Sequence, residues 1–179
     1  ILYLSSGYNE YKQWLPVVFK APMQIFKTDF PQYLVLNLGT SDEGDMKYLL
    51  SIVKPYISII TDITQRYKEG FADMDSLVKE YELLVRKTDP RGLVLLNRDN
   101  VRVKNLKQYS SASTVFYGES EDCDPKIVNI EKNKRGQEIT LEHRGDRQQF
   151  QINKFGRHHI YAFAAGLVIK KYYGQKKTG

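Results

Sequence analysis

QYLVLNL at residues 32–38, YISIITDI at 56–63 and GLVLLN at 92–97 are three short apolar runs, and they decide the fold class. The runs are rich in Leu, Ile and Val and have little polar alternation. This is typical of strands buried on both faces of a parallel sheet, where helices cover both sides. We therefore predict three buried parallel strands in this part of the chain.

Two helical patterns separate these runs. In MKYLLSIVK, residues 46–54, apolar side chains recur at helical spacing, and over residues 74–85 they form one continuous stripe. Asp73 is the expected N-cap of the second helix, and the DPRG sequence at residues 89–92 ends it. Residues 32–97 are thus predicted to run strand, helix, strand, helix, strand, which is a doubly wound α/β pattern.

The second half of the chain has a different sequence pattern. Its apolar segments are short, and apolar and polar residues alternate along them only in part. A turn is expected at Gly145-Asp146, and we predict a helix that ends at Gly174. The expected organisation is one fragment of three parts: an α/β core (1–110), a small antiparallel sheet (111–155), and a closing helix with a basic tail (156–179). The expected strands of the small sheet are TVFYG (114–118), KIVNIEK (126–132), QEITLEHR (137–144) and RQQFQINKF (147–155).

Composition excludes several classes of protein. The chain has 179 residues, 41% of them hydrophobic and 12% aromatic, which suits a compact domain and not a disordered chain. Its single Cys excludes an intrachain disulfide framework. No apolar run reaches the roughly 20 residues of a membrane span, so we expect no membrane partner and a cytoplasmic location.

The net charge of +6 is concentrated at one end of the chain. No acidic residue follows Asp146, and the seven cations beyond it give that segment +7, so residues 1–146 carry about −1. Neither a recognition helix nor an RNA-binding signature accompanies this basic end. Nucleic-acid binding is therefore the weakest of the functional hypotheses.

Two places in the sequence are candidates for binding chemistry. Gly39 and Gly44 have the glycine spacing of a P-loop, but Asp45 follows where the phosphate-binding Lys belongs, which excludes that motif. The acidic loop of which Asp45 is part is suited to binding a cation or to forming a solvated turn. His158 and His159 can contact a ligand, although no third metal ligand accompanies them.

Taken together and in order, several segments resemble the central domain of the Mur ligases, which are ATP-dependent enzymes that add amino acids to the peptidoglycan precursor. The glycine-rich loop is similar to the family's apolar-E-x-G-x4-G-E-apolar motif, and the closing helix is similar to G-x-H-N-x-x-N-A-x-A-A. The similar segments are SSGYNEYKQWLP (5–16), LVLNLGTSDEGDM (34–46), VKPYISIITDI (53–63), FADMDSLVKEYELL (71–84), GLVLLNRDN (92–100) and FGRHHIYAFAAGLVI (155–169).

The resemblance implies ATP and Mg²⁺ as cofactors, but the chain departs from the family at the positions that serve them. The family's magnesium-binding Glu aligns with Asn37, its His with Tyr67, and its carbamylated Lys with Tyr81, although Lys79 is half a turn away. The family's P-loop unit is expected before residue 1. The candidate nucleotide-binding residues are Asn97, Asp99 and His158, which match the family's motifs, and His159, which aligns with one of its adenine-contacting Asn residues.

Because of these departures, the sequence leaves two hypotheses about enzymatic activity open. The first is the central part of a divergent ligase that does not catalyse ligation alone, with the remaining domains of its parent chain as partners. The second is a degenerate pseudoenzyme that acts as a scaffold, with a protein partner or a second copy of itself.

Overall fold

The computed structural model describes residues 32–65 and 70–176. The chain divides into two compact units, Ile1–Asn37 and Leu38–Gly179. In the first unit the described residues 32–37 form no strand and are exposed, Val35 by 93%. The predicted strand at 32–38 is therefore wrong for the structure. An apolar run shows only that a segment suits a strand, whereas a strand also needs a hydrogen-bonded neighbour.

A three-stranded parallel sheet forms the centre of the second unit. Its strands β1 (Ile57–Ile60), β2 (Leu93–Asn97) and β3 (Ser113–Tyr117) lie in the order β1-β2-β3. Every residue of β2 is buried, as the unbroken apolar run predicts for a central strand. These pairings confirm the predicted strands at 56–63 and 92–97.

The position of β3 corrects one prediction. We expected TVFYG at 114–118 to belong to the antiparallel sheet, but β3 pairs in parallel with β2, Leu93 facing Ser113 and Asn97 facing Tyr117. Partial alternation of apolar residues describes which faces of a strand are buried. It does not determine the direction of the neighbouring strand, which follows from the connection between the two.

Helices α2 (Asp45–Ile52) and α3 (Met74–Lys87) confirm the two predicted helical patterns. Asp73 is the N-cap of α3, because its side chain accepts a hydrogen bond from the Ser76 backbone N–H at 2.7 Å. The helix ends with Arg86 and Lys87 in its last turn, where positive charge is favoured.

Two short elements that the sequence did not reveal connect β2 to β3. They are the five-residue helix α4 (Val101–Asn105) and the 3₁₀ helix η2 (Leu106–Tyr109). Val103 and Leu106 are buried from these elements and join the core cluster that α2 and α3 form with one face of the parallel sheet. Such short helices escape a search for periodicity, since five residues hold little more than one turn.

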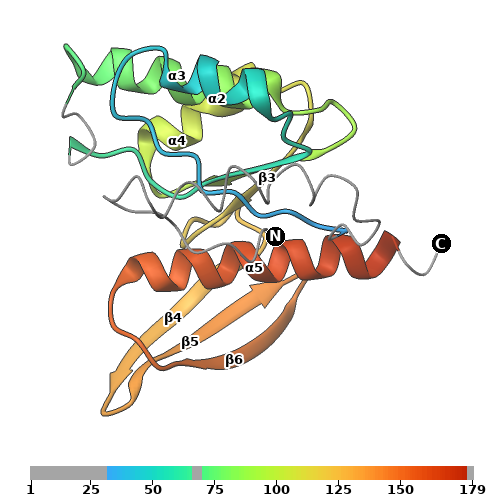
Figure 1. Ribbon diagram of the computed structural model, residues 1–179. Coiled ribbons are helices and arrows are strands. Elements are labelled where there is room, and N and C mark those ends of the chain that lie inside the picture. The colour runs from blue at the N-terminus through green and yellow to red at the C-terminus, as the bar shows by residue number, and fades with distance from the viewer. Residues whose placement is uncertain (1–31, 66–69, 177–179) are drawn as a thin grey trace, which may run out of the picture. The chain divides into compact units, whose positions relative to one another are not determined.

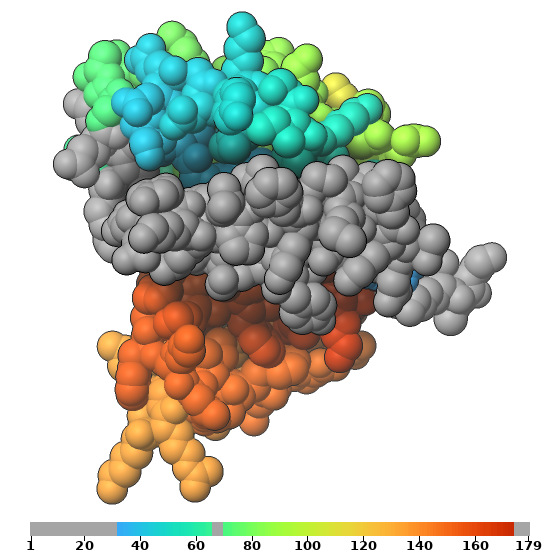
Figure 2. Space-filling view, viewed as in Figure 1, coloured from blue at the N-terminus to red at the C-terminus, as the bar shows by residue number. Residues whose placement is uncertain are grey.

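A second, antiparallel sheet consists of β4 (Lys126–Asn133), β5 (Gly136–His143) and β6 (Asp146–Ile152), in that order. The turn between β5 and β6 is Arg144-Gly145, one residue earlier than predicted. Both residues have positive φ, 52° and 85°, as a tight hairpin turn requires. The turn between β4 and β5 projects from the body, with its residues exposed (Figure 2).

Helix α5 (Arg157–Lys176) packs against both sheets (Figure 1). Its buried side chains, Ile160 and Ala164 among them, share one core cluster with Leu95 of β2 and Ile139 of β5. The helix continues to Lys176, so the predicted end at Gly174 is wrong. Among the described helices none has the length and apolar character that crossing a membrane requires.

Candidate functional site

Polar side chains gather where the three parallel strands end. Thr61 follows β1, Asn97 is the last residue of β2, and Glu119 and Ser120 lie in the loop after β3. Parallel strands end at one edge of their sheet, and ligands of open α/β proteins bind outside that edge. This edge is therefore the candidate site.

Asn97, a predicted nucleotide-binding residue, is only 2% exposed and ties two loops together. Its Nδ2 donates to the carbonyl oxygen of Thr61 at 2.8 Å, and its Oδ1 accepts from the Asp99 backbone N–H at 3.0 Å. Both ends of the amide are thus engaged inside the protein. The arrangement fixes the loop after β1 against the loop after β2.

Asp99, a second predicted nucleotide-binding residue, joins three elements through its carboxylate. It accepts from the Glu119 backbone N–H at 2.9 and 3.1 Å, from the Ser120 hydroxyl at 3.3 Å, and from the Tyr161 hydroxyl at 3.1 Å. Burial, followed by the charge of Asp99, raises the pKa of Tyr161 to about 12. The Tyr161 hydroxyl therefore stays protonated as a donor at neutral pH.

The first turn of α5 lies beside this cluster. Arg157 forms an ion pair with Glu119 at 2.9 Å, and Tyr161, one turn along the helix, reaches Asp99. The rings of His158 and His159 are 4.0 Å apart between centroids. Burial, and then the neighbouring His158, lower the pKa of His159. Within the described residues no hydrogen bond or ion pair engages either imidazole, so both can contact a ligand.

Gln137 positions the start of α5, a role that the sequence analysis missed. It is 2% exposed, and its Nε2 donates to the carbonyl oxygens of Lys154 and Gly156 at 3.0 and 3.2 Å. The signal was present in the alternation of β5. Gln137 occupies the same inward-facing row as Ile139 and Leu141, where a polar side chain needs a partner.

Asp45, the candidate metal ligand, folds back on its own loop. Its Oδ2 accepts from the backbone N–H groups of Ser41 and Asp42 at 2.8 and 3.0 Å. These bonds, the one from Asp42 first, lower the pKa of Asp45. The structure therefore gives Asp45 the role of a loop-stabilising residue.

Glu80 accepts hydrogen bonds at the end of the same loop, but from a different helix. This α3 residue is 8% exposed and accepts from the Gly44 and Met46 backbone N–H groups at 2.9 and 2.7 Å. It thereby replaces the side-chain cap that α2 lacks at Gly44. The sequence signal was a charged residue on the apolar stripe of α3, between Leu77 and Leu84.

In the loop between Gly39 and Gly44, carboxylates thus hold the N–H groups of Ser41, Asp42 and Gly44. A phosphate-binding loop must leave such N–H groups free for the ligand. The geometry agrees with the exclusion of a P-loop from the sequence.

The positions that the resemblance assigns to catalysis fall in different parts of the chain. Asn37 is exposed in the first unit, and Tyr81 is half-buried and packs against the core of the second. Tyr67 lies outside the described residues. Lys79, the alternative to Tyr81, is exposed.

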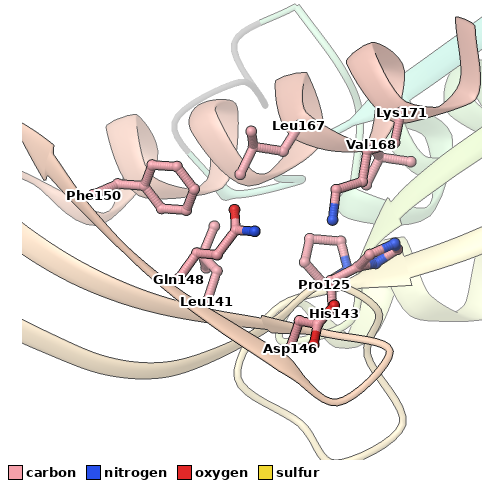
Figure 3. A pocket seen from close by; sticks show the side chains of 9 residues that line it. All are labelled: Pro125, Leu141, His143, Asp146, Gln148, Phe150, Leu167, Val168 and Lys171. Atoms are coloured by element: carbon pink, nitrogen blue, oxygen red, sulfur yellow. The ribbon is translucent and has the colours of Figure 1, made fainter. Parts of the chain in front are cut away.

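The pocket between the antiparallel sheet and α5 is too small for a nucleotide (Figure 3). Its volume is about 20 Å³, which is room for one water molecule. Phe150 and Gln148 line it from β6, and Leu167 and Lys171 line it from α5. His143 also lines the pocket, and its Nδ1 contacts the Asp124 carboxylate. We assign this pocket to the packing between sheet and helix.

The described residues do not fit the magnesium ion and the ATP phosphates that the resemblance implies. No group of three His, Cys, Asp or Glu side chains is arranged to hold a metal in the described part of the chain. Carboxylates engage the Ser41, Asp42 and Gly44 N–H groups of the Gly39–Gly44 loop, and Asn97 and Asp99 are engaged internally. We therefore derive no reaction step through either cofactor for this segment.

The fold and this edge define an α/β domain with an appended antiparallel sheet and a potential ligand edge at the ends of its parallel strands. Residues 16–169 match the family model of the Mur ligase middle domain. This match covers most of the chain, and the chain belongs to that family.

Curated relatives of the chain are cell-wall ligases. It is 26% identical over 144 residues to the UDP-N-acetylmuramate–L-alanine ligase of Streptomyces coelicolor, a match that covers 77% of this chain and 30% of that protein. It is 22% identical over 142 residues to the UDP-N-acetylmuramoyl-tripeptide–D-alanyl-D-alanine ligase of Escherichia coli, with 78% and 31% covered. The chain therefore spans about a third of the length of these relatives.

Solved structures agree on the fold. The MurF ligase of Thermotoga maritima, determined in complex with ADP, superposes with a TM-score of 0.72 at 16% identity, covering 86% of this chain and 36% of that one. MurF from Acinetobacter baumannii gives a TM-score of 0.71 at 19% identity, covering 80% and 31%. These likenesses confirm the predicted architecture of a parallel sheet with helices and a small antiparallel sheet.

Proposed function

We propose that this chain is a central-domain portion of an ATP-dependent ligase that joins an acid to an amino acid in cell-wall precursor synthesis. Family membership and the names of the relatives support this function. On this proposal the chain does not catalyse ligation by itself, and other domains of its parent chain supply ATP and Mg²⁺ binding.

One observation carries the non-catalytic part of the proposal. Where the family places an acid and a Lys, this chain has Asn37 and Tyr81, and Tyr81 packs against the core. A neutral amide is a far weaker ligand for Mg²⁺ than a carboxylate. In the adjacent loop, Asp45 engages the Ser41 and Asp42 N–H groups, and Glu80 engages those of Gly44 and Met46.

The test is a ligation assay on the longest reading frame that contains this chain. The substrates are a UDP-linked muramoyl carboxylate and a set of amino acids, with ADP release and the new amide both measured. We expect ADP and amide in equal amounts from the full product of the gene and neither from the 179-residue chain. Amide formation by the 179-residue chain alone would overturn the proposal.

The alternative is a degenerate member of the family that acts as a scaffold for a protein partner or for a second copy. The substitutions at Asn37 and Tyr81 favour it. It predicts no P-loop Lys in the parent gene and no ATP-dependent thermal shift in the full-length protein. Such a shift, together with a P-loop Lys, would favour the ligase.

Nucleic-acid binding is the weakest proposal, supported only by the basic carboxy-terminal segment. Lys170 and Lys171 lie in the last part of a long helix, where cations are favoured in any case. It predicts affinity for DNA or RNA that falls steeply with salt. Binding that is absent, or independent of salt, would dispose of it.

A further inference from the structure

An open hollow lies at the carboxyl ends of β1 and β2, away from the small pocket beside α5. Ile63, Thr64 and Gln65 line it from the loop after β1, and Asn100 and Arg102 line it from the start of α4. Its volume is about 490 Å³, much of it open to solvent. Its place between the loops of neighbouring parallel strands is where α/β proteins bind their ligands.

Asn100 forms a fixed wall of this hollow. Its Oδ1 accepts from the Val103 backbone N–H at 3.0 Å, and its Nδ2 donates to the Asp62 carboxylate and to the carbonyl oxygen of Ile63 at 3.3 Å. The amide is therefore fully engaged, and it ties the two lining loops together. These bonds hold the Asn100 side of the hollow in place.

Three polar side chains of the lining are free to bind. In the described part of the chain, no hydrogen bond or ion pair engages the Thr64 hydroxyl, the Gln65 amide or the exposed Arg102 guanidinium. The guanidinium offers a planar fork of donors that matches a phosphate or a carboxylate. Together with a hydroxyl and an amide, it forms a set rich in hydrogen-bond donors.

The charge around Arg102 also favours an anion. No acidic residue occurs between Asn100 and Gly118, and Lys104 and Lys107 follow Arg102 along the same connection. The nearby Asp62 carboxylate, which accepts a hydrogen bond from Asn100, keeps its negative charge. The Arg102 side of the hollow is therefore the favourable side for negative charge.

We propose that this hollow binds an anionic group, a phosphate or a carboxylate, through Arg102, with Thr64 and Gln65 as hydrogen-bonding partners. The inference does not depend on the chain being part of a ligase. Its test measures binding alone, so a failed ligation assay leaves it standing.

The experiment compares Arg102→Gln with the unaltered chain by NMR titration of backbone amides with inorganic phosphate and, separately, with acetate. The control is Arg135→Gln, which removes an equally exposed Arg from the β4–β5 turn, where no ion pair of the described residues involves its guanidinium. We expect phosphate to shift amides of residues 63–65 and 100–102. Arg102→Gln should weaken that binding by about tenfold, in keeping with the loss of a charge-assisted hydrogen bond.

The two ligands distinguish the source of the anion. Binding of phosphate but not acetate assigns the hollow to a phosphate group, and binding of acetate with the same Arg102 dependence assigns it to a carboxylate. The inference is overturned if neither anion shifts these amides, or if Arg102→Gln and Arg135→Gln bind as the unaltered chain does. A folded amide spectrum of each variant makes the comparison valid.

Discussion

Glu80 is the residue whose role depends most on the folded structure. It lies on α3, yet its two carboxylate oxygens cap the first turn of α2, 36 and 34 residues earlier in the chain. Hydrogen bonds from buried N–H groups to a carboxylate are among the stronger ones in proteins, and the loss of an acceptor leaves a buried donor unsatisfied. Glu80 thus couples loop, helix and core.

Glu80→Gln should lower the free energy of unfolding by about 2 kcal/mol, because the amide can accept only one of the two hydrogen bonds. Urea unfolding followed by circular dichroism measures the change. The matched control is Glu43→Gln, an exposed position in the same loop, which should leave stability nearly unchanged. Equal effects from the two variants would contradict the capping role.

Cys123 provides a prediction about reactivity. It is 7% exposed, and burial raises its pKa to about 12 from an ordinary value near 9.0. The reactive thiolate forms as pH rises through the pKa, so the folded protein should hold the unreactive thiol up to at least pH 9.

Ellman's reagent should therefore react slowly with the folded chain at pH 8 and at once with one thiol in urea. A rapid reaction of the folded chain at pH 8 would show that the thiol is accessible or ionised.

At the scale of elements, the structural role of a residue was predictable where it depends on neighbours in sequence. It was not predictable where it depends on a partner far away in the chain. Asp73 caps α3 as expected because its partner, Ser76, lies three residues away. The central strand β2 followed from its unbroken apolar run. By contrast, the parallel pairing of β3 and the absence of a strand at 32–38 depend on neighbours that no local pattern specifies.

The candidate site shows the same division. Asn97, Asp99, His158 and His159 were selected from motif resemblance, and the structure places Asn97 and Asp99 at the strand ends and both histidines in the first turn of α5. What the sequence could not reveal is that Asn97 and Asp99 are engaged by Thr61, Glu119 and Tyr161. Those partners are up to 62 residues away, and their contacts exist only in the folded chain.

A substitution at Gly118 tests how Asp99 joins the loop after β3 to α5. Its φ is +148°, and a Cβ there would lie 2.6 Å from an Asp99 carboxylate oxygen. Gly118→Ala should displace Asp99 and release its bond to Tyr161, which loosens the start of α5. Hydrogen exchange should then accelerate over residues 157–164, with less change in β5.

Gly39→Ala is the control, because a Cβ at that position meets no atom within 4 Å. The proposed junction would be wrong if the two alanine variants exchanged equally in α5.

At the scale of the whole chain, the family fold is retained, and on our proposal the chemistry of its nucleotide site is altered. The parallel sheet, the helices on both of its faces and the appended antiparallel sheet are those of the Mur ligase middle domain. Carboxylates occupy the loop that follows residue 38, and a tyrosine packs where the resemblance expects a lysine.

The most direct test of this account is calorimetric titration of the purified 179-residue chain with Mg²⁺–ATP, with ADP formation followed in the same samples. We predict no saturable heat at millimolar ATP and no ADP above the level without protein. Saturable binding together with ADP release by this chain alone would contradict the account.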